Sequence, residues 1–264
     1  MCKLLEVSRS GYYDWIKRLD VPDKDEWLVG AIRACQNKSR KTYGYRRVRL
    51  WLIRNHGIVV NHKALLRIMN KYNLLSEVRR RRKYQHYSQC VHRYENILNR
   101  DFKADRFNQK WVTDITYVHT KQGVLYLSAI KDLYDGFIVG YQYGSEQTND
   151  LVSRTVRNAI KNEMVANGLV LHSDQGAQYT SHEYHCLTKE YGIAPSMSRR
   201  GNCLDNACAE NFFGQLKSEC INRVKLSTFE ETQQLIDEYI YFYNYERIQL
   251  KTKLTPYEKR CQSA

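Results

Sequence analysis

The sequence predicts an α/β protein, with a mixed five-stranded sheet covered by helices on both faces and a mostly helical region before it. From about residue 110 onward, short β-branched segments alternate with amphipathic ones in the order β-β-β-α-β-α-β-α-α, which is typical of a mixed sheet. Before that point, apolar residues recur at helical spacing. The 264 residues, 42% of them hydrophobic, can bury a sizeable core in one large domain or in two to three small ones.

Positive charge is concentrated in the first 100 residues. They hold 23 Lys and Arg against 8 Asp and Glu, a net +15, whereas residues 101–264 hold 19 against 20, a net −1. A basic region beside a near-neutral body indicates a module that binds a polyanion, and nucleic acid is the best candidate. The alternative is that the charge only aids solubility.

Composition also excludes several classes of protein. No apolar run approaches the roughly 18 residues of a membrane span, and the first residues lack the apolar stretch of a secretory signal. We therefore expect a cytoplasmic protein without a membrane partner. The eight cysteines include no Cys-x-x-Cys pair, so we expect reduced thiols rather than a disulfide framework or a zinc site.

Two short helices in the basic region predict a helix-turn-helix. They span 44–54 and 62–73, with Gly57 breaking the chain between them and Asn61 as the N-cap of the second. The second helix would enter the major groove of DNA, although such pairs also occur as plain structural units. Its cations would face phosphates or base edges: Lys63, Arg67 and Lys71.

Segments on either side of these helices are also informative. An amphipathic stretch at 3–19 has Ser10 as a candidate N-cap, Pro22 ends it, and helical periodicity resumes at Glu26. Downstream, five consecutive cations repel one another unless a polyanion neutralises them, so they are interpreted as a DNA-binding arm or as a solvated linker. These cations are Arg79, Arg80, Arg81, Arg82 and Lys83.

The remaining elements follow from periodicity and turn residues. The expected strands are 111–118, 124–132, 137–143, 169–173 and 193–197, with Asp135-Gly136 as a hairpin turn. The expected helices are 148–164, 181–191, 207–221 and 229–243.

Three acidic residues in this body are candidates for chemistry. Asp114 lies inside a strand, where aspartate is rare, Asp174 closes a short strand, and Glu210 lies on a helix. Three converging carboxylates would form a hard, oxygen-rich site suited to Mg²⁺ or Mn²⁺, and two such ions can promote in-line phosphodiester displacement. Lys217 shares the helix face of Glu210 and could hold a DNA phosphate. The alternative is that each acid is an isolated surface or capping carboxylate.

Other polar residues near these acids have structural interpretations. His172 shares a strand face with Asp174, and a buried, hydrogen-bonded histidine is favoured over one that contacts water or phosphate. Asp205 is a rival to Glu210, but it is interpreted, with Asn206, as a helix cap. The tyrosines between 239 and 245 are expected to pack rather than to stack on bases.

The spacing of the acids supports a family resemblance. Asp114 and Asp174 have 59 residues between them, and Asp174 and Glu210 have 35, which resembles the DDE signature of retroviral integrases and many bacterial transposases. Several segments closely resemble OrfB-type transposases of the bacterial insertion-sequence-three family. They are 111–117, 172–179 and 201–213, the C-terminal 243–248 and 254–257, and 43–48 in the helix-turn-helix.

The resemblance implies a ribonuclease-H-like catalytic core. It implies Asp114, Asp174 and Glu210 as catalytic ligands of two Mg²⁺ or Mn²⁺ ions, and Lys217 as the basic residue that follows the glutamate. The implied enzyme is a transposase that cuts and joins DNA at the terminal inverted repeats of an insertion sequence. Water would first free a 3′-hydroxyl, which would then attack another phosphodiester. The implied partners are double-stranded DNA, at the terminal repeats and the target, and further copies of the chain, at the bacterial nucleoid.

The implied organisation has five parts. They are a partial N-terminal helical segment and linker at 1–22, a helix-turn-helix region at 23–78, a basic linker at 79–105, a catalytic core at 106–225 and a C-terminal helical extension at 226–264. In this family, frameshifting usually fuses an upstream frame to such a chain, and the first 19 residues resemble the tail of that region.

Two alternatives to a transposase remain at this point. One is a non-catalytic, DNA-binding regulator of transposition made from the same reading frame. The other is a ribonuclease-H-like nuclease that acts on RNA–DNA hybrids, although a helix-turn-helix favours duplex DNA.

Overall fold

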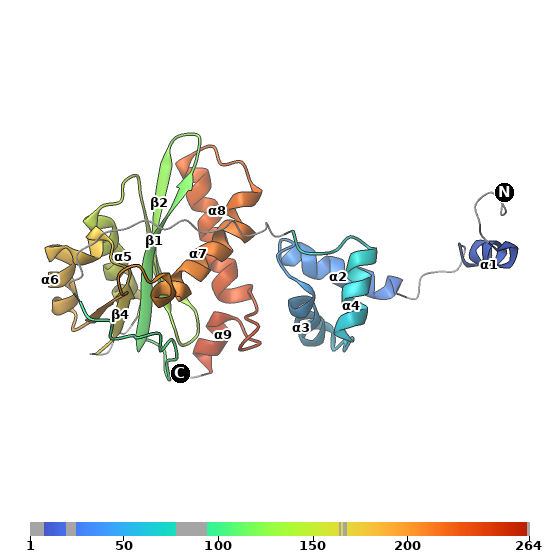
Figure 1. Cartoon of the computed structure of the whole chain (residues 1–264), viewed down its shortest axis with the longest axis horizontal. Helices are drawn as coiled ribbons and strands as arrows, with labels where there is room; N and C mark the ends of the chain where they lie inside the picture. Colours follow the sequence, from blue (N-terminus) through green and yellow to red (C-terminus); the bar gives the residue numbers. More distant parts are fainter. Residues whose placement is uncertain (1–7, 20–24, 78–93, 164, 166–167, 263–264) are drawn as a thin grey trace. The chain divides into compact units, whose positions relative to one another are not determined.

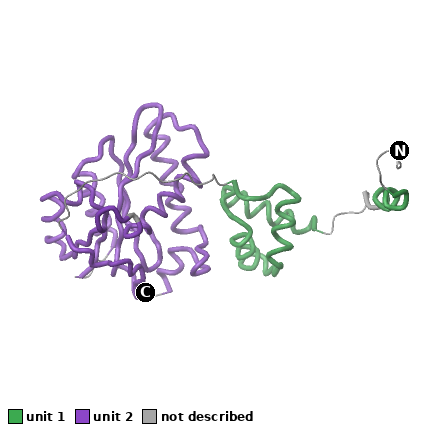
Figure 2. The backbone as a smooth tube through the Cα atoms, in the orientation of Figure 1, with its two compact units in different colours: residues 1–77 green, residues 78–264 purple. Residues whose placement is uncertain are grey.

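The computed structural model describes residues 8–19, 25–77, 94–163, 165 and 168–262. The chain divides into two compact units, residues 1–77 and 78–264 (Figures 1 and 2). This division separates the helical region from the sheet, while the finer boundaries expected from the sequence stay predictions. Within the described ranges, no helix has both the length and the apolar character needed to cross a membrane.

The first unit is helical. Its helices are α1 (Arg9–Leu19), α2 (Glu26–Lys38), α3 (Tyr45–His56) and α4 (His62–Lys71). The Ser8 hydroxyl accepts a hydrogen bond from the Gly11 amide at 3.1 Å, so the cap of α1 is two residues earlier than the predicted Ser10. Gly57 ends α3 with φ 65°, and the Asn61 side chain caps α4 by accepting from the Lys63 amide, as predicted.

A small apolar core joins α2, α3 and α4. The buried residues Ile32, Leu52 and Leu65 represent the three helices in it. Gln36 supplies the polar link, because its Nε2 donates to the carbonyls of Tyr43 at 2.9 Å and Leu74 at 2.8 Å. One buried amide therefore fastens the segment after α4 to the turn before α3.

The second unit contains the predicted mixed five-stranded sheet, with strand order β3-β2-β1-β4-β5. The strands are β1 (Lys110–His119), β2 (Val124–Asp132), β3 (Ile138–Gly144), β4 (Val170–Ser173) and β5 (Ala194–Met197). β1, β2 and β3 pair antiparallel, whereas β4 runs parallel to both β1 and β5. The antiparallel hairpins and parallel crossovers thus meet at the central strand β1.

Helices cover both faces of this sheet (Figure 1). The helices of the unit that flank the strands are α5 (Asn149–Asn162), α6 (His182–Glu190) and α7 (Ala207–Glu219). Successive residues of β1 point to opposite layers: Trp111 packs in the cluster that includes α5 and α6, and Val112 packs with Ala209 of α7. Gly140 of β3 lets α5 approach closely, because an added Cβ would lie 2.7 Å from the Cβ of Ala159.

The C-terminal extension contains α8 (Phe229–Tyr241), a π-helical turn (Phe242–Glu246) and α9 (Pro256–Cys261). The predicted helix 229–243 thus changes to π-helical geometry at Phe242, and α9 is an element that the periodicity did not predict. Tyr239 and Tyr243 are buried as expected for packing residues, whereas Tyr241 and Tyr245 are exposed.

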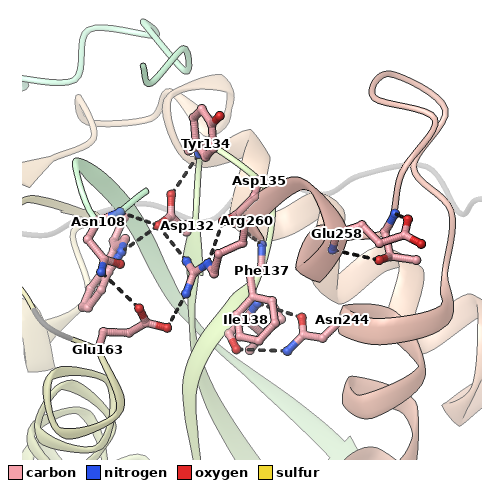
Figure 3. A network of polar contacts seen from close by, with 12 residues as sticks. Asn108, Asp132, Tyr134, Asp135, Phe137, Ile138, Glu163, Asn244, Glu258 and Arg260 are labelled. Atoms are coloured by element: carbon pink, nitrogen blue, oxygen red, sulfur yellow. Dashed lines mark hydrogen bonds and ion pairs between the residues drawn. The ribbon is translucent and has the colours of Figure 1, made fainter. Parts of the chain in front are cut away.

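Polar side chains fasten the extension to the sheet and to α7. Asn244 pairs with the edge strand β3, since its Oδ1 accepts from the Ile138 amide at 2.9 Å and its Nδ2 donates to the Ile138 carbonyl at 3.1 Å (Figure 3). Arg247 binds Glu219 at the end of α7 through two hydrogen bonds, of 2.6 and 2.8 Å. β3 is an edge strand, so the two Asn244 bonds satisfy backbone groups of Ile138 that no further strand in the described part of the chain pairs.

Arg260 makes a third attachment, here called the Arg260 cluster, with Asp132, Asp135 and Glu163 (Figure 3). Its Nε donates to Asp135 at 2.7 Å, its Nη2 donates to Asp132 at 3.0 Å, and its Nη1 pairs with Glu163. Burial, with the charge of Asp135, raises the pKa of Asp132 to about 6. One guanidinium therefore serves three carboxylates and holds α9 against the hairpin of β2 and β3.

Candidate active site

The parallel pairing of β1 with β4 brings the first two candidate acids to matching positions. Lys110, Trp111 and Val112 pair with Val170, Leu171 and His172, a constant offset of 60 residues. The same offset relates Asp114, within β1, to Asp174, which follows the last residue of β4. The register of the sheet thus places both carboxylates at the same level of neighbouring strands.

A tight turn follows Asp174. Its Oδ1 accepts a hydrogen bond from the Gly176 amide at 3.0 Å, and a Cβ on Gly176 would lie 3.0 Å from that same oxygen. The 3-10 turn Ala177–Thr180 then places the buried Tyr179 hydroxyl 3.2 Å from the Thr113 hydroxyl. This contact ties the turn back to β1 beside Asp114.

Glu210 reaches the same region from α7. The Asn206 Nδ2 donates to the Thr113 carbonyl at 3.2 Å, and Ala209 packs against Val112. These contacts hold the first turn of α7 against β1, so Glu210 lies close to the strand that carries Asp114.

The electrostatics indicate that the three acids lie near one another. Burial, the charge of Asp174 and the charge of Glu210 raise the pKa of Asp114 well above its usual value, while Lys217 opposes the rise. Burial also raises the pKa of Asp174. Carboxylates that disfavour one another's ionisation in this way form a site that favours a bound cation.

The three acidic side chains do not, however, converge on one point. Among the residues that the structure describes, no group of three or more His, Cys, Asp or Glu side chains is arranged to hold a metal ion. Asp114 Oδ1 instead accepts from the Ile115 amide at 2.8 Å. The acids are thus within electrostatic reach of one another, and their role as ligands stays a prediction.

Lys217 lies on α7 beside the acids, as its spacing from Glu210 predicts. Burial lowers the pKa of its half-buried ammonium, and the charge of Asp114 opposes that change. The ammonium lies over the ring of Tyr117, with 4.9 Å between Nζ and the ring centroid. Sequence reasoning missed Tyr117, because it lies three residues after Asp114 on β1 and residues three apart on a strand point to opposite faces, so no local pattern linked the two.

His172 is a structural residue, as favoured from the sequence. Its ring is buried, and its Nδ1 and Nε2 lie 2.8 Å and 3.1 Å from the hydroxyls of Ser196 and Ser198. Burial lowers its pKa to about 4, so the ring is neutral at pH 7. The histidine thereby links β4 to β5 and the segment after it.

Asp205 has a different structural role from the predicted helix cap. The Arg199 guanidinium donates to both of its oxygens, at 2.9 Å each, and Arg100 Nε donates at 2.8 Å. The bonds from Arg199 hold the pKa of this buried carboxyl well below its usual range. Asp205 therefore binds two arginines. The Asn206 side chain hydrogen-bonds to β1 and makes no capping bond to α7.

The predicted DNA-contacting cations of the first unit lie exposed on α4. Arg67 Nη2 is 2.7 Å from Asp25 Oδ2, and Lys71 Nζ is 5.5 Å from the centroid of the Tyr72 ring. Lys63 is also exposed, at the N-terminal end of the helix. The five cations Arg79, Arg80, Arg81, Arg82 and Lys83 lie outside the described residues.

Three family models match this chain. An HTH-like domain matches residues 22–83, and two integrase core domain models match residues 104–203 and 210–263. The matches define a protein class in which a helix-turn-helix-like region is followed by an integrase core. The three acids fall within the two integrase core matches.

Individual relatives define the family more narrowly. The chain is 40% identical over its whole length to the putative transposase InsK of insertion element IS150 from Escherichia coli, covering 93% of that protein. It is 32% identical to the transposase InsF of insertion sequence IS3A from the same species, covering 91% of this chain and 85% of InsF. The chain belongs to the transposases of the insertion-sequence-three family.

A solved structure shows the same fold. The simian T-cell lymphotropic virus intasome, in complex with a regulatory subunit of PP2A, contains a chain that is 16% identical. The alignment covers 85% of this chain and 73% of that one, with a TM-score of 0.52. The likeness agrees with the predicted fold class, an integrase-type mixed sheet preceded by helices.

Proposed function

We propose that this chain is a DDE-type transposase that catalyses metal-dependent DNA strand cleavage and strand transfer at the terminal inverted repeats of an insertion sequence. The observation that carries the proposal is the placement of Asp114, Asp174 and Glu210 on β1, at the end of the paired strand β4 and on the α7 turn that packs against β1. A lysine lies beside them, and the family membership supplies the reaction class. An enzyme with this substrate acts in the bacterial cytoplasm, at the nucleoid.

The donor set fits a hard divalent cation. Asp114, Asp174 and Glu210 offer only carboxylate oxygens, the ligands that Mg²⁺ and Mn²⁺ prefer, and would hold two such ions once their side chains turn toward each other. Bound ions would supply Lewis acidity for both the attacking and the leaving oxygen of an in-line displacement. The raised pKa of Asp114 is consistent with a site completed by positive charge.

The protein residues would orient the DNA. The Lys217 ammonium, two helical turns beyond Glu210, would contact a phosphate of the bound strand. In the first step a water oxygen bonds to phosphorus while the bond to the 3′ oxygen breaks, which frees a 3′-hydroxyl. In the second step that hydroxyl bonds to the phosphorus of another strand and displaces its 3′ oxygen.

Recognition of DNA would come from the first unit and the segment after it. In the proposed complex, Lys63, Arg67 and Lys71 on α4 face the major groove, and residues 79–83 contact the backbone of double-stranded DNA. Joining two element ends to a target requires at least two catalytic units, so the active form is an oligomer of this chain on DNA.

The test removes one ligand charge at a time. Asp114→Asn, Asp174→Asn and Glu210→Gln should each lower Mg²⁺-dependent nicking of inverted-repeat DNA by about a thousandfold or more, while DNA affinity is kept. Glu163→Gln, which removes one charge from the Arg260 cluster, is the matched control. Assayed under conditions in which it is folded, this variant should nick DNA at the wild-type rate. The measurement is the single-turnover rate of cleavage on a labelled duplex.

The same assay separates the transposase from the regulator that the sequence left open. A wild-type protein that binds the duplex but does not nick it with Mg²⁺ or Mn²⁺ would be a non-catalytic binding protein. Substantial nicking by one amide variant would remove that residue from the proposed ligand set.

A further inference from the structure

Tyr117 is a partly exposed aromatic residue near the candidate acids. It lies on β1, three residues after Asp114, and 53% of its surface is exposed, whereas its neighbours Thr116 and Val118 are buried. An exposed tyrosine is ordinary by itself. The unusual feature of Tyr117 is the charged group that lies over its ring.

That group is the Lys217 ammonium. Its Nζ lies 4.9 Å from the Tyr117 ring centroid, within the roughly 6 Å over which the negative face of a ring attracts a cation. The same ammonium interacts with the charge of Asp114. The lysine is therefore attracted by two groups, a carboxylate and an aromatic face.

The two attractions have different consequences for a flexible side chain. An ammonium drawn only by Asp114 would close on the carboxylate and compete with a divalent ion for its oxygens. The ring face attracts the ammonium without occupying any carboxylate lone pair. Tyr117 thus gives the ammonium a contact close to the acids that occupies none of their oxygens.

We propose that Tyr117 is a positioning residue of this active site, whose ring holds the Lys217 ammonium beside Asp114 for contact with a DNA phosphate. The inference rests on the function proposed above and goes beyond it, because it makes DNA affinity depend on a strand residue that acts through the lysine. Since the contact uses the ring face, phenylalanine should replace tyrosine, and leucine should not.

The test is a double-mutant cycle on DNA affinity. The probe is a duplex carrying the inverted repeat of the element that encodes the chain, titrated without divalent ions so that cleavage does not intervene. Tyr117→Leu should weaken binding about fivefold, and Tyr117→Phe should stay within about twofold of wild type. In a Lys217→Met background, Tyr117→Leu should have no further effect.

A matched control and a second readout keep structural damage apart from the proposed role. Tyr241→Leu removes another tyrosine of the same unit, 59% exposed on α8, and should leave affinity unchanged. In cleavage assays, Tyr117→Leu should raise KM for the duplex more than it lowers kcat. Proton NMR should show the Lys217 side-chain methylenes shifted upfield by the ring in wild type and Tyr117→Phe, and not in Tyr117→Leu.

Two results would overturn the inference. One is an equal loss of affinity in Tyr117→Phe and Tyr117→Leu. The other is a full effect of Tyr117→Leu in the Lys217→Met background. The proposed function would fail on a different result, a wild-type protein that does not nick DNA. In that case NMR would still show whether the Tyr117 ring contacts Lys217.

Discussion

Two clusters in this unit each combine three carboxylates with one cation, and they differ in how the cation meets the acids. In the Arg260 cluster, the guanidinium binds each carboxylate with a different nitrogen (Figure 3). At the candidate active site, the Lys217 ammonium lies over a tyrosine ring, while Asp114 and Asp174 each accept a hydrogen bond from a backbone amide. The number of acids is therefore a poor guide to function, and the geometry of their countercharge is a better one.

The difference has a physical cause in the two cations. Arginine presents a rigid fork of donors that can satisfy several oxygens at once, whereas lysine carries a compact charge on a flexible stem. A cluster satisfied by arginine is complete and serves stability. At the candidate active site the lysine contacts a ring face instead of forming such a fork of hydrogen bonds, an arrangement that agrees with the metal and DNA binding proposed above.

The largest expected effect is the loss of stability on removing Arg260. Arg260→Met would leave Asp132, Asp135 and Glu163 without their shared countercharge in a mostly buried place, which should lower the free energy of unfolding by about 3–5 kcal/mol. Urea denaturation followed by circular dichroism measures it.

Arg154→Met is the matched control for this loss. Arg154 pairs with Asp150 on the exposed surface of α5, so the variant should cost less than about 1 kcal/mol. Equal losses in the two variants would mean that the Arg260 cluster is no more stabilising than a surface pair.

The Arg260 cluster also shows what the sequence could not predict. The partners of Arg260 lie 97, 125 and 128 residues away in the chain, and no local pattern connects residues so distant. Local signals were sufficient elsewhere. β2 runs from Val124 to Asp132 as periodicity predicts, and α2 begins at Glu26 as expected.

Two expectations that the structure does not bear out concern α9 and Asp205. Thr255, Pro256 and Glu258 form a capping box with proline at the first turn, which marks the start of α9. Asp205 precedes a helix, a position typical of a cap, but Arg199 binds both of its carboxylate oxygens and Arg100 binds one of them. A cap is a local interpretation, and it fails where a distant cation competes for the same group.

The sequence predicts which residues belong to the candidate site, but it does not predict how their side chains are arranged. Spacing and resemblance predict the acids and Lys217 as site residues, and the pairing of β1 with β4 explains why Asp114 and Asp174 lie at the same level of neighbouring strands. The contact between Lys217 and Tyr117 depends on the exact approach of α7 to β1, which spacing alone does not define.

The next effect concerns pH and the buried Asp132. Its pKa is raised to about 6, so between about pH 4 and 6 the folded state keeps a proton that the unfolded chain releases. The free energy of unfolding should therefore fall as pH rises through this range, by up to about 3 kcal/mol from this group.

Asp132→Asn should remove that component of the pH dependence. The measurement is urea denaturation of the variant and the wild type at both ends of the range, with Asp150→Asn on the exposed surface as control. A stability difference between Asp132→Asn and wild type that does not change with pH would contradict the prediction.

The smallest effect tests whether the two clusters differ in their response to metal ions. Mg²⁺ that binds the folded candidate site should stabilise the protein by about 1.4 kcal/mol at ten times its dissociation constant, because it relieves repulsion among Asp114, Asp174 and Glu210. Thermal unfolding with Mg²⁺, against NaCl at equal ionic strength, measures this. Asp114→Asn should lose the stabilisation, whereas Glu163→Gln should keep it, since its cluster already has Arg260 as countercharge. Equal stabilisation of both variants would mean that the ion binds elsewhere, and the distinction between the clusters would then rest on DNA contacts alone.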